Sequence, residues 1–285
     1  NPCMKVISSV YQLTIFLANH PRKGSIGFVP TMGALHEGHA SLIKKSLSQN
    51  ALSVCSIFVN PTQFNNKRDF KNYPNRLNKD IKLLRAIGCD VAFIPTKETI
   101  YPNGLTSKVF DFGSLDKVME GESRPGHFNG VAMVVSRFFE IIKPNRAYFG
   151  EKDFQQLAII KSLATQKFKG VEIVPCSTFR EKDGLAMSSR NLLLDKRYRA
   201  AAPRIYQSLL TIQGRAKNTS VSELRSWIKN VYKKDEDLVL EYFEIADAKS
   251  LKKSDCWSDF PEHVACIAVF AGTTRLIDNI LLEIN

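Results

Sequence analysis

Residues 25–39 read SIGFVPTMGALHEGH, an apolar run followed by a polar stretch that contains glycine and histidine. The apolar part predicts a strand over residues 25–30, and the polar part predicts the start of a helix. A helix N-terminus has unpaired N–H groups and a positive dipole end, which together stabilise a bound phosphate. His36 and His39 lie on one face of the first helical turn. We therefore predict a phosphate site here. The alternative is that both histidines only cap and solvate the helix.

The rest of the first 175 residues alternates short apolar runs with amphipathic stretches. This alternation is typical of a parallel sheet covered by helices. One helical pattern ends before Gly88, and a nearly all-apolar one at residues 131–142 ends before Pro144. We predict an α/β fold, a Rossmann-like doubly wound parallel sheet, with strands at residues 25–30, 52–59, 90–94, 146–149 and 171–175.

The pattern changes after about residue 182. Two helical stretches come first, and three strand-like runs follow. That order predicts a smaller α+β domain, with helices at 195–217 and 221–234 and strands at 239–246, 264–271 and 275–282. The polar stretch 181–184 is a suitable boundary, so the predicted domains are 1–181 and 182–285.

Composition limits the class of protein. The chain has 285 residues, 44% of them hydrophobic, and no run of eighteen apolar residues. The first ten residues lack a charged-then-apolar signal pattern, so we expect a cytoplasmic protein with no membrane partner. The cysteines are scattered without a C-x-x-C pair, and we expect them to be reduced and structural: Cys3, Cys55, Cys89, Cys176, Cys256 and Cys266.

The net charge of +12 has two explanations, a solvated basic surface or a nucleic-acid footprint. Many lysines and arginines lie in helix-like stretches, such as residues 82–85 and 196–199, without a basic tail or interleaved aromatic residues. We therefore favour the solvated surface and predict no nucleic-acid partner.

The four residues His36-Glu37-Gly38-His39 have the form H-x-G-H, which resembles the signature of the nucleotidyltransferase superfamily. Members of that superfamily pair it with a second loop of the K-M-S-K-S type. Residues 187–190, Met-Ser-Ser-Arg, resemble that loop, with Arg190 as its cation. Small hydroxyls and a cation on a mobile loop suit a pyrophosphate leaving group.

Further segments are similar to one family, pantothenate synthetase (pantoate–β-alanine ligase). The matching segments occur in the family's order, and the last of them agrees more weakly: 56–64, 124–128, 149–157, 186–191 and 275–279. The resemblance implies that domain 1–181 binds ATP and pantoate and that domain 182–285 acts as a lid.

For ATP, the resemblance implies a catalytic group made of His36, His39, Lys152, Ser188, Ser189 and Arg190. Lys152 would reach the α-phosphate. The remaining implied ATP-binding residues are Pro30, Thr31, Met32, Gly33, Gly38, Gly150, Asp153, Phe179 and Met187. Phe179 stands where the family usually has a smaller aliphatic residue against adenine, and it would tighten or reshape the adenine pocket.

For the acceptors, glutamine and asparagine can hydrogen-bond hydroxyl groups without bringing charge. The resemblance makes Gln63 and Gln156 a pantoate clamp, with Met32 and Phe64 over the gem-dimethyl group. It adds Asn60, Arg124 and His127 to the pantoate and β-alanine site. It also implies Asp80 as a magnesium ligand, although Lys79 stands where some relatives carry a second acid.

The implied reaction has two halves. The carboxylate of (R)-pantoate attacks the α-phosphorus of ATP, which gives pantoyl adenylate and pyrophosphate. The amine of β-alanine then displaces AMP and forms pantothenate, a precursor of coenzyme A. The implied cofactors and partners are ATP, Mg²⁺, pantoate and β-alanine, and the family is homodimeric.

Two alternatives stay open. A different small-molecule nucleotidyltransferase would keep the nucleotide on a phosphate acceptor, so free AMP would not form. A tRNA-binding protein of synthetase type is favoured only by the +12 charge, and a salt-sensitive tRNA complex would reveal it.

Overall fold

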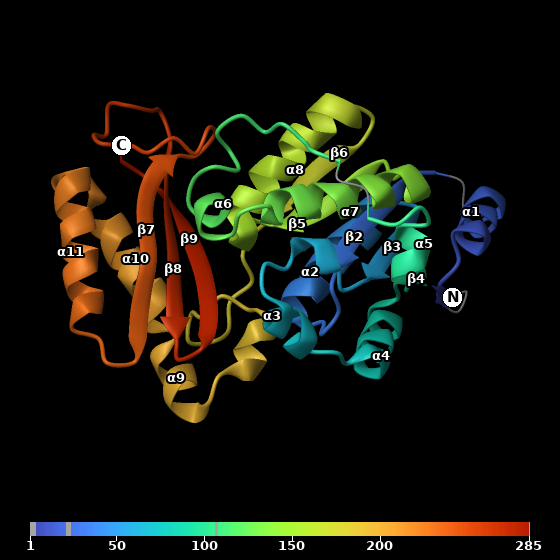
Figure 1. Cartoon of the computed structure of the whole chain (residues 1–285), viewed down its shortest axis with the longest axis horizontal. Helices are drawn as coiled ribbons and strands as arrows, with labels where there is room; N and C mark the ends of the chain where they lie inside the picture. Colours follow the sequence, from blue (N-terminus) through green and yellow to red (C-terminus); the bar gives the residue numbers. More distant parts are fainter. Residues whose placement is uncertain (1–3, 21–23, 106–107, 285) are drawn as a thin grey trace. The chain divides into compact units, whose positions relative to one another are not determined.

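In the computed structural model, residues 4–20, 24–105 and 108–284 are described. Two compact units share the chain (Figure 1). The first contains residues 1–112, 124–151 and 156–177. The second contains 113–123, 152–155 and 178–285. Two short segments, 113–123 and 152–155, thus belong to the second unit although the chain around them belongs to the first. The predicted domains, 1–181 and 182–285, are each one continuous stretch, so they place both short segments in the first domain.

The first unit contains a six-stranded parallel sheet in the order β1-β4-β3-β2-β5-β6. The predicted Rossmann-like fold is confirmed, and all five predicted strands form. The edge strand β1 was not predicted. Only one of its three residues is buried, whereas the equally short β4 is buried throughout. The strands are β1 Lys5–Ile7, β2 Ile26–Thr31, β3 Leu52–Ile57, β4 Val91–Phe93, β5 Arg146–Gly150 and β6 Glu172–Cys176.

The strand order reverses beside β2. From β2 the chain moves outward to β3 and β4, and it then returns to β5 on the other side of β2. In open α/β sheets, ligands bind outside the carboxyl ends of the strands at such a switch point. Here those ends are Thr31 and Gly150, next to the predicted phosphate site.

Helices cover both faces of this sheet (Figure 1). Successive strand residues point to opposite faces. A Cβ at Gly27 would meet Ser46 of α2, whereas Phe28 contacts Phe138 and Phe139 of α7. The helices of this unit are α1 Val10–Asn19, α2 Glu37–Gln49, η1 Pro61–Gln63, α3 Lys67–Asn72, α4 Leu77–Ile87, α5 Lys97–Ile100, α7 His127–Ile142 and most of α8 Phe154–Lys167.

The second unit contains an antiparallel sheet in the order β7-β8-β9, with α10 and α11 packed on one face (Figure 1). The predicted α+β pattern is confirmed. The helix predicted at 195–217 is divided, because Pro203 cannot donate the hydrogen bond that a continuous helix needs. The elements are α6 Glu120–Ser123, η2 Glu151–Asp153 at the unit boundary, η3 Ser189–Leu193, α9 Lys196–Ala201, α10 Arg204–Arg215, η4 Ala216–Asn218, α11 Val221–Lys233, β7 Leu238–Asp247, β8 His263–Ala271 and β9 Thr274–Leu282.

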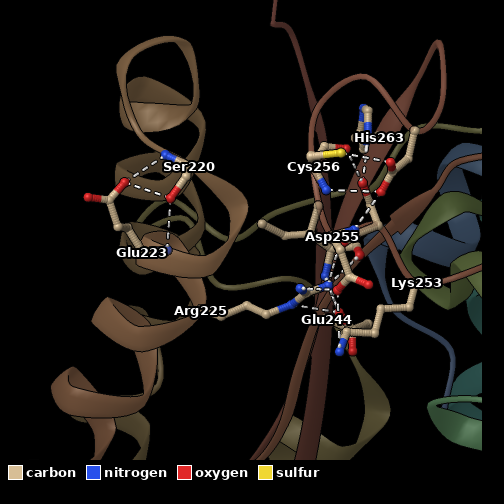
Figure 2. Close-up of polar contacts among 11 residues, drawn as sticks. Ser220, Glu223, Arg225, Glu244, Lys253, Asp255, Cys256 and His263 are labelled. Atoms are coloured by element: carbon tan, nitrogen blue, oxygen red, sulfur yellow. Dashed lines mark hydrogen bonds and ion pairs between the residues drawn. The ribbon is translucent and has the colours of Figure 1, made fainter.

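Two sets of polar contacts hold α11, one at its first turn and one at Arg225 (Figure 2). At its start, Ser220 and Glu223 form a reciprocal capping box, each side chain accepting a backbone N–H of the other. On its face toward the sheet, Arg225 donates to Glu244 of β7 at 2.9 Å and to Asp255 of the following loop at 3.2 Å. These bonds tie helix, strand and loop together around the apolar core.

The cysteines at 55, 89, 176, 256 and 266 are free thiols, and Cys3 lies outside the described residues. Four of the five are buried, and burial raises the pKa of Cys89 to about 12. Among the described residues no helix is long and apolar enough to cross a membrane.

Candidate active site

The predicted phosphate loop joins β2 to α2. Pro30 and Thr31 are the last residues of β2, and the Thr31 hydroxyl donates to the Ser56 carbonyl of the neighbouring strand at 2.6 Å. Gly33 has φ +82° and Ala34 has φ +49°, both in the left-handed region that favours glycine. The chain therefore turns sharply between Met32 and the first turn of α2, which contains Gly38.

Asp80 holds this turn from α4. Its carboxylate accepts the backbone N–H of Ala34 at 2.9 Å through one oxygen and that of Leu35 at 2.8 Å through the other. The residue is only 2% exposed, and burial raises its pKa above the ordinary aspartate value. The structure thus gives Asp80 a loop-holding role that the sequence did not predict, and its metal role stays a prediction.

His36 and His39 meet at the start of α2, with ring centroids 4.0 Å apart. The backbone N–H of His36 donates to Nδ1 of His39 at 3.3 Å. A neutral imidazole that accepts at Nδ1 carries its hydrogen on Nε2. His39 therefore carries its N–H at the other ring nitrogen, and an N–H is the kind of group that donates to a phosphate oxygen.

An amide cluster lies at the end of β3, formed by Asn60, Gln63 and their partners. The Asn60 amide donates to Oε1 of Gln63 at 3.2 Å and to the Gly130 carbonyl at 3.1 Å. The Gln63 amide donates to Sδ of Met32 at 3.2 Å. The structure therefore brings together Asn60 and Gln63, two residues predicted to bind pantoate or β-alanine, and Met32 connects them to the phosphate loop.

His127 joins the same cluster, because its Nδ1 lies 2.8 Å from the Gln63 carbonyl oxygen. Asn60, Gln63 and His127 are all buried. Gly130 allows this approach, since a Cβ there would lie 2.2 Å from the Thr62 carbonyl oxygen. The helix α7 can pack against η1 only without that side chain.

Two members of the cluster were not predicted. The hydroxyls of Tyr101 and Thr62 both donate to Oδ1 of Asn60, at 2.9 and 3.1 Å. They fix the amide orientation of Asn60, so that its NH₂ faces Gln63. Tyr101 follows α5, far from any recognised motif, and no local signal in the sequence connects it with Asn60.

The remaining acceptor residues are not in this hydrogen-bonded cluster. Phe64 packs edge-on against Phe70 and Tyr73, with centroids 5.3 and 5.8 Å apart. Arg124 lies three residues before His127, whose N–H donates to the Arg124 carbonyl at 3.1 Å. Gln156 is half-buried on α8.

In the second unit, Lys152 lies in η2, two residues after Gly150 at the end of β5. Its side chain is 19% exposed, and Nζ lies 3.7 Å from Oδ1 of Asp153. The Lys152 carbonyl accepts the side-chain amide of Asn279 at 2.9 Å. Lys152 is thus held at its backbone, while its ammonium lies near the half-exposed carboxylate of Asp153.

The Met187–Arg190 loop closes a turn that begins at Phe179. The Met187 N–H donates to the Phe179 carbonyl at 2.9 Å. Ser188 caps η3, its hydroxyl accepting the Arg190 N–H at 3.2 Å, and Ser189 is buried. Phe179 is 41% exposed, so its ring is available to stack on a planar group.

Few side chains of the described residues could bind magnesium together. Among the residues that the structure describes, no group of three or more histidine, cysteine or acidic side chains could hold a metal ion. Mg²⁺ commonly keeps several waters and binds one or two carboxylates together with substrate phosphates. Each oxygen of Asp80 accepts one N–H and keeps a second acceptor position, which fits an ion held mainly by ATP but not a resident ion.

Comparison with known proteins shows the family of the chain. The Pantoate-beta-alanine ligase family model matches residues 5–281. The pantothenate synthetase of Bacteroides fragilis is 49% identical over 278 residues, 97% of this chain and 98% of that protein.

Two solved structures are similar over nearly the whole chain. The pantothenate synthetase of Thermus thermophilus has a TM-score of 0.90 at 39% identity, covering 97% of this chain and 99% of that one. The Francisella tularensis pantoate-beta-alanine ligase, complexed with beta-gamma ATP and beta-alanine, has a TM-score of 0.82 at 37% identity, covering 98% and 97%. The chain therefore belongs to the pantoate–β-alanine ligase family.

Proposed function

We propose that this chain condenses (R)-pantoate with β-alanine through a pantoyl-adenylate intermediate, consuming ATP and releasing AMP and pyrophosphate. The contact between Met32 and Gln63 supports this function most directly. It places a buried, uncharged amide cluster beside the loop that leads to the helix N-terminus. A phosphate-binding turn adjoining a neutral hydrogen-bonding pocket suits a substrate that carries hydroxyl groups and is activated by ATP.

In the first half-reaction, a pantoate carboxylate oxygen attacks the α-phosphorus, and the bond to the bridging oxygen of pyrophosphate breaks. We assign charge stabilisation to His36 and His39 in the first unit. We assign it to Lys152, Ser188, Ser189 and Arg190 in the second. The Nε2–H of His39 and the ammonium of Lys152 would donate to oxygens whose negative charge grows in the transition state. Asp80 acts by keeping the turn at Ala34 and Leu35 in shape.

In the second half-reaction, the β-alanine amine attacks the acyl carbonyl and AMP leaves. No nucleophilic side chain is required, because the adenylate already carries the leaving group. The amine must attack as the free base and lose a proton afterwards. We assign the acceptor pocket to Met32, Asn60, Gln63, Phe64, Arg124, His127 and Gln156. We assign the nucleotide pocket to residues 30–33, Gly38, Gly150, Asp153, Phe179 and Met187.

We propose that magnesium enters with ATP, bound mainly by phosphate oxygens and water, with Asp80 as its protein ligand. Such an ion would neutralise phosphate charge during the attack. A homodimer and a cytoplasmic location are part of the same proposal. The homodimer rests on the family resemblance, and the location rests on the sequence pattern.

Omission of single substrates tests the proposed function. We expect AMP to form from ATP and magnesium only when pantoate and β-alanine are both present. The reason is that AMP leaves in the second half-reaction, which needs the amine. Chromatography of nucleotides after incubation measures this. AMP formation with neither acceptor would indicate an ATP pyrophosphohydrolase, and a nucleotide that stays attached to a phosphate acceptor would indicate a different nucleotidyltransferase.

A further inference from the structure

The segment 275–279 of β9 carries three polar residues, Arg275, Asp278 and Asn279, among apolar neighbours. Arg275 and Asn279 point to one face of the sheet and Asp278 to the other, since alternate strand residues share a face. Asp278 lies opposite Ile267, a member of the apolar core under the helices. Asp278 and Asn279 are 4% and 8% exposed. Buried polar groups of this kind need partners, and theirs are informative.

On the first face, β9 holds the two short segments that join this unit from earlier in the chain. Arg275 donates to both carboxylate oxygens of Glu120, at 2.8 and 2.7 Å. The Tyr242 hydroxyl also donates to Glu120, and burial beside that carboxylate raises the pKa of Tyr242. The Glu120 N–H in turn donates to Oε1 of Gln155 at 3.0 Å. Segments 113–123 and 152–155 are therefore joined to each other and to β9.

On the same face, Asn279 holds Lys152 itself. The amide of Asn279 donates to the Lys152 carbonyl at 2.9 Å. This bond fixes the peptide plane that follows Lys152 and so the direction in which the lysine side chain leaves the backbone. A cation that must meet developing charge depends on that direction.

On the other face, Asp278 holds the base of the turn that leads to Ser188. Its carboxylate accepts two bonds from the guanidinium of Arg180, at 2.7 and 3.0 Å. Arg180 stacks on the Tyr206 ring at 3.5 Å and forms a β-bridge with Ala186. The backbone N–H of Asn279 donates to the same Asp278 carboxylate at 2.8 Å. The adjacent residues Asp278 and Asn279 thus hold the two segments assigned to the nucleotide in the second unit, the turn before Ser188 and the backbone of Lys152.

We propose that Asp278 and Asn279 are positioning residues for adenylate formation, which set the backbone of Lys152 and the turn carrying residues 187–190 in fixed register on β9. The proposal rests on the proposed function, because it needs Lys152 and that turn to act on ATP. Neither residue is assigned contact with a substrate. Their effect passes through the segments that they hold.

A double-mutant cycle between Asn279 and Lys152 tests this. Asn279→Ala removes the bond to the Lys152 carbonyl, and Asn279→Asp keeps the size but replaces the donor with an acceptor. We expect either variant to lower the maximal rate of pantoate-dependent pyrophosphate exchange by about 10-fold, with KM for pantoate unchanged. In a Lys152→Ala background the same change should have almost no further effect, because the group that it positions is gone.

The matched control is Gln213→Leu. Like Asn279, Gln213 donates its side-chain amide to a backbone carbonyl. Its acceptor is Leu281 of β9, at 3.0 Å, and not Lys152. Its exchange rate should equal that of wild type. A purely structural Asn279 would lower the melting temperature, and its effect would add to that of Lys152→Ala, which would overturn the proposal. Absence of exchange in the wild type would instead contradict the proposed function.

Discussion

Replacing Lys152 with alanine is expected to lower adenylate formation by about 10²–10³-fold, the usual effect of losing one preorganised charge-stabilising donor. Lys152 is held at its backbone by Asn279, and its side chain is largely buried beside Asp153. The point where its side chain leaves the backbone is therefore fixed before ATP binds. The measurement is pantoate-dependent exchange of labelled pyrophosphate into ATP.

The control for Lys152 is Lys161→Ala, which removes an exposed lysine of α8 from the same basic chain. It should exchange at the wild-type rate, because surface charge alone contributes little to a preorganised site. His39→Ala should resemble Lys152→Ala and keep the fold. Near-normal exchange in Lys152→Ala would remove this lysine from the catalytic group.

The second prediction concerns the amide clamp. Replacing Gln63 or Gln156 with leucine keeps approximate bulk but leaves a polar group of pantoate unpaired, at a cost of about 1–3 kcal/mol. At about 1.4 kcal/mol per tenfold, pantoate should bind roughly 5- to 150-fold more weakly. Gln63→Leu also removes the acceptor of Asn60, so we expect the larger effect there.

Calorimetric titration of pantoate and of ATP into each variant makes this comparison. ATP binding without pantoate should be almost unchanged, because neither glutamine is assigned to the nucleotide. The matched control is Gln166→Leu, since Gln166 is an exposed glutamine of α8 that contacts Asp111 and Ser162 only on the surface. Equal losses for both ligands would indicate a damaged pocket, and unchanged pantoate binding would remove the clamp.

The sequence predicted the parallel sheet and the turn at its switch point because both depend on local pattern. An apolar run followed by Gly33, His36 and His39 signals a strand, a turn and a helix start without knowledge of the rest. Pro203 is also a local signal for a break, but the apolar period continues on both sides of it, so the pattern predicts a single helix.

The contacts that hold the site could not be predicted in the same way. Asp80 and Ala34 are 46 positions apart, and Glu120 and Arg275 are 155 apart. Nothing in either residue's neighbours indicates its partner, since the pairing exists only after both segments have packed. The resemblance implied which residues would touch ligands, but it was weakest at 275–279, where Asn279 donates to the Lys152 carbonyl.

Exchange of labelled pyrophosphate into ATP, with pantoate present and β-alanine absent, tests the central claim most directly. If this chain activates pantoate as an adenylate before the amine enters, label should appear in ATP under those conditions and should not appear without pantoate. Exchange that requires β-alanine would contradict a pantoyl-adenylate intermediate.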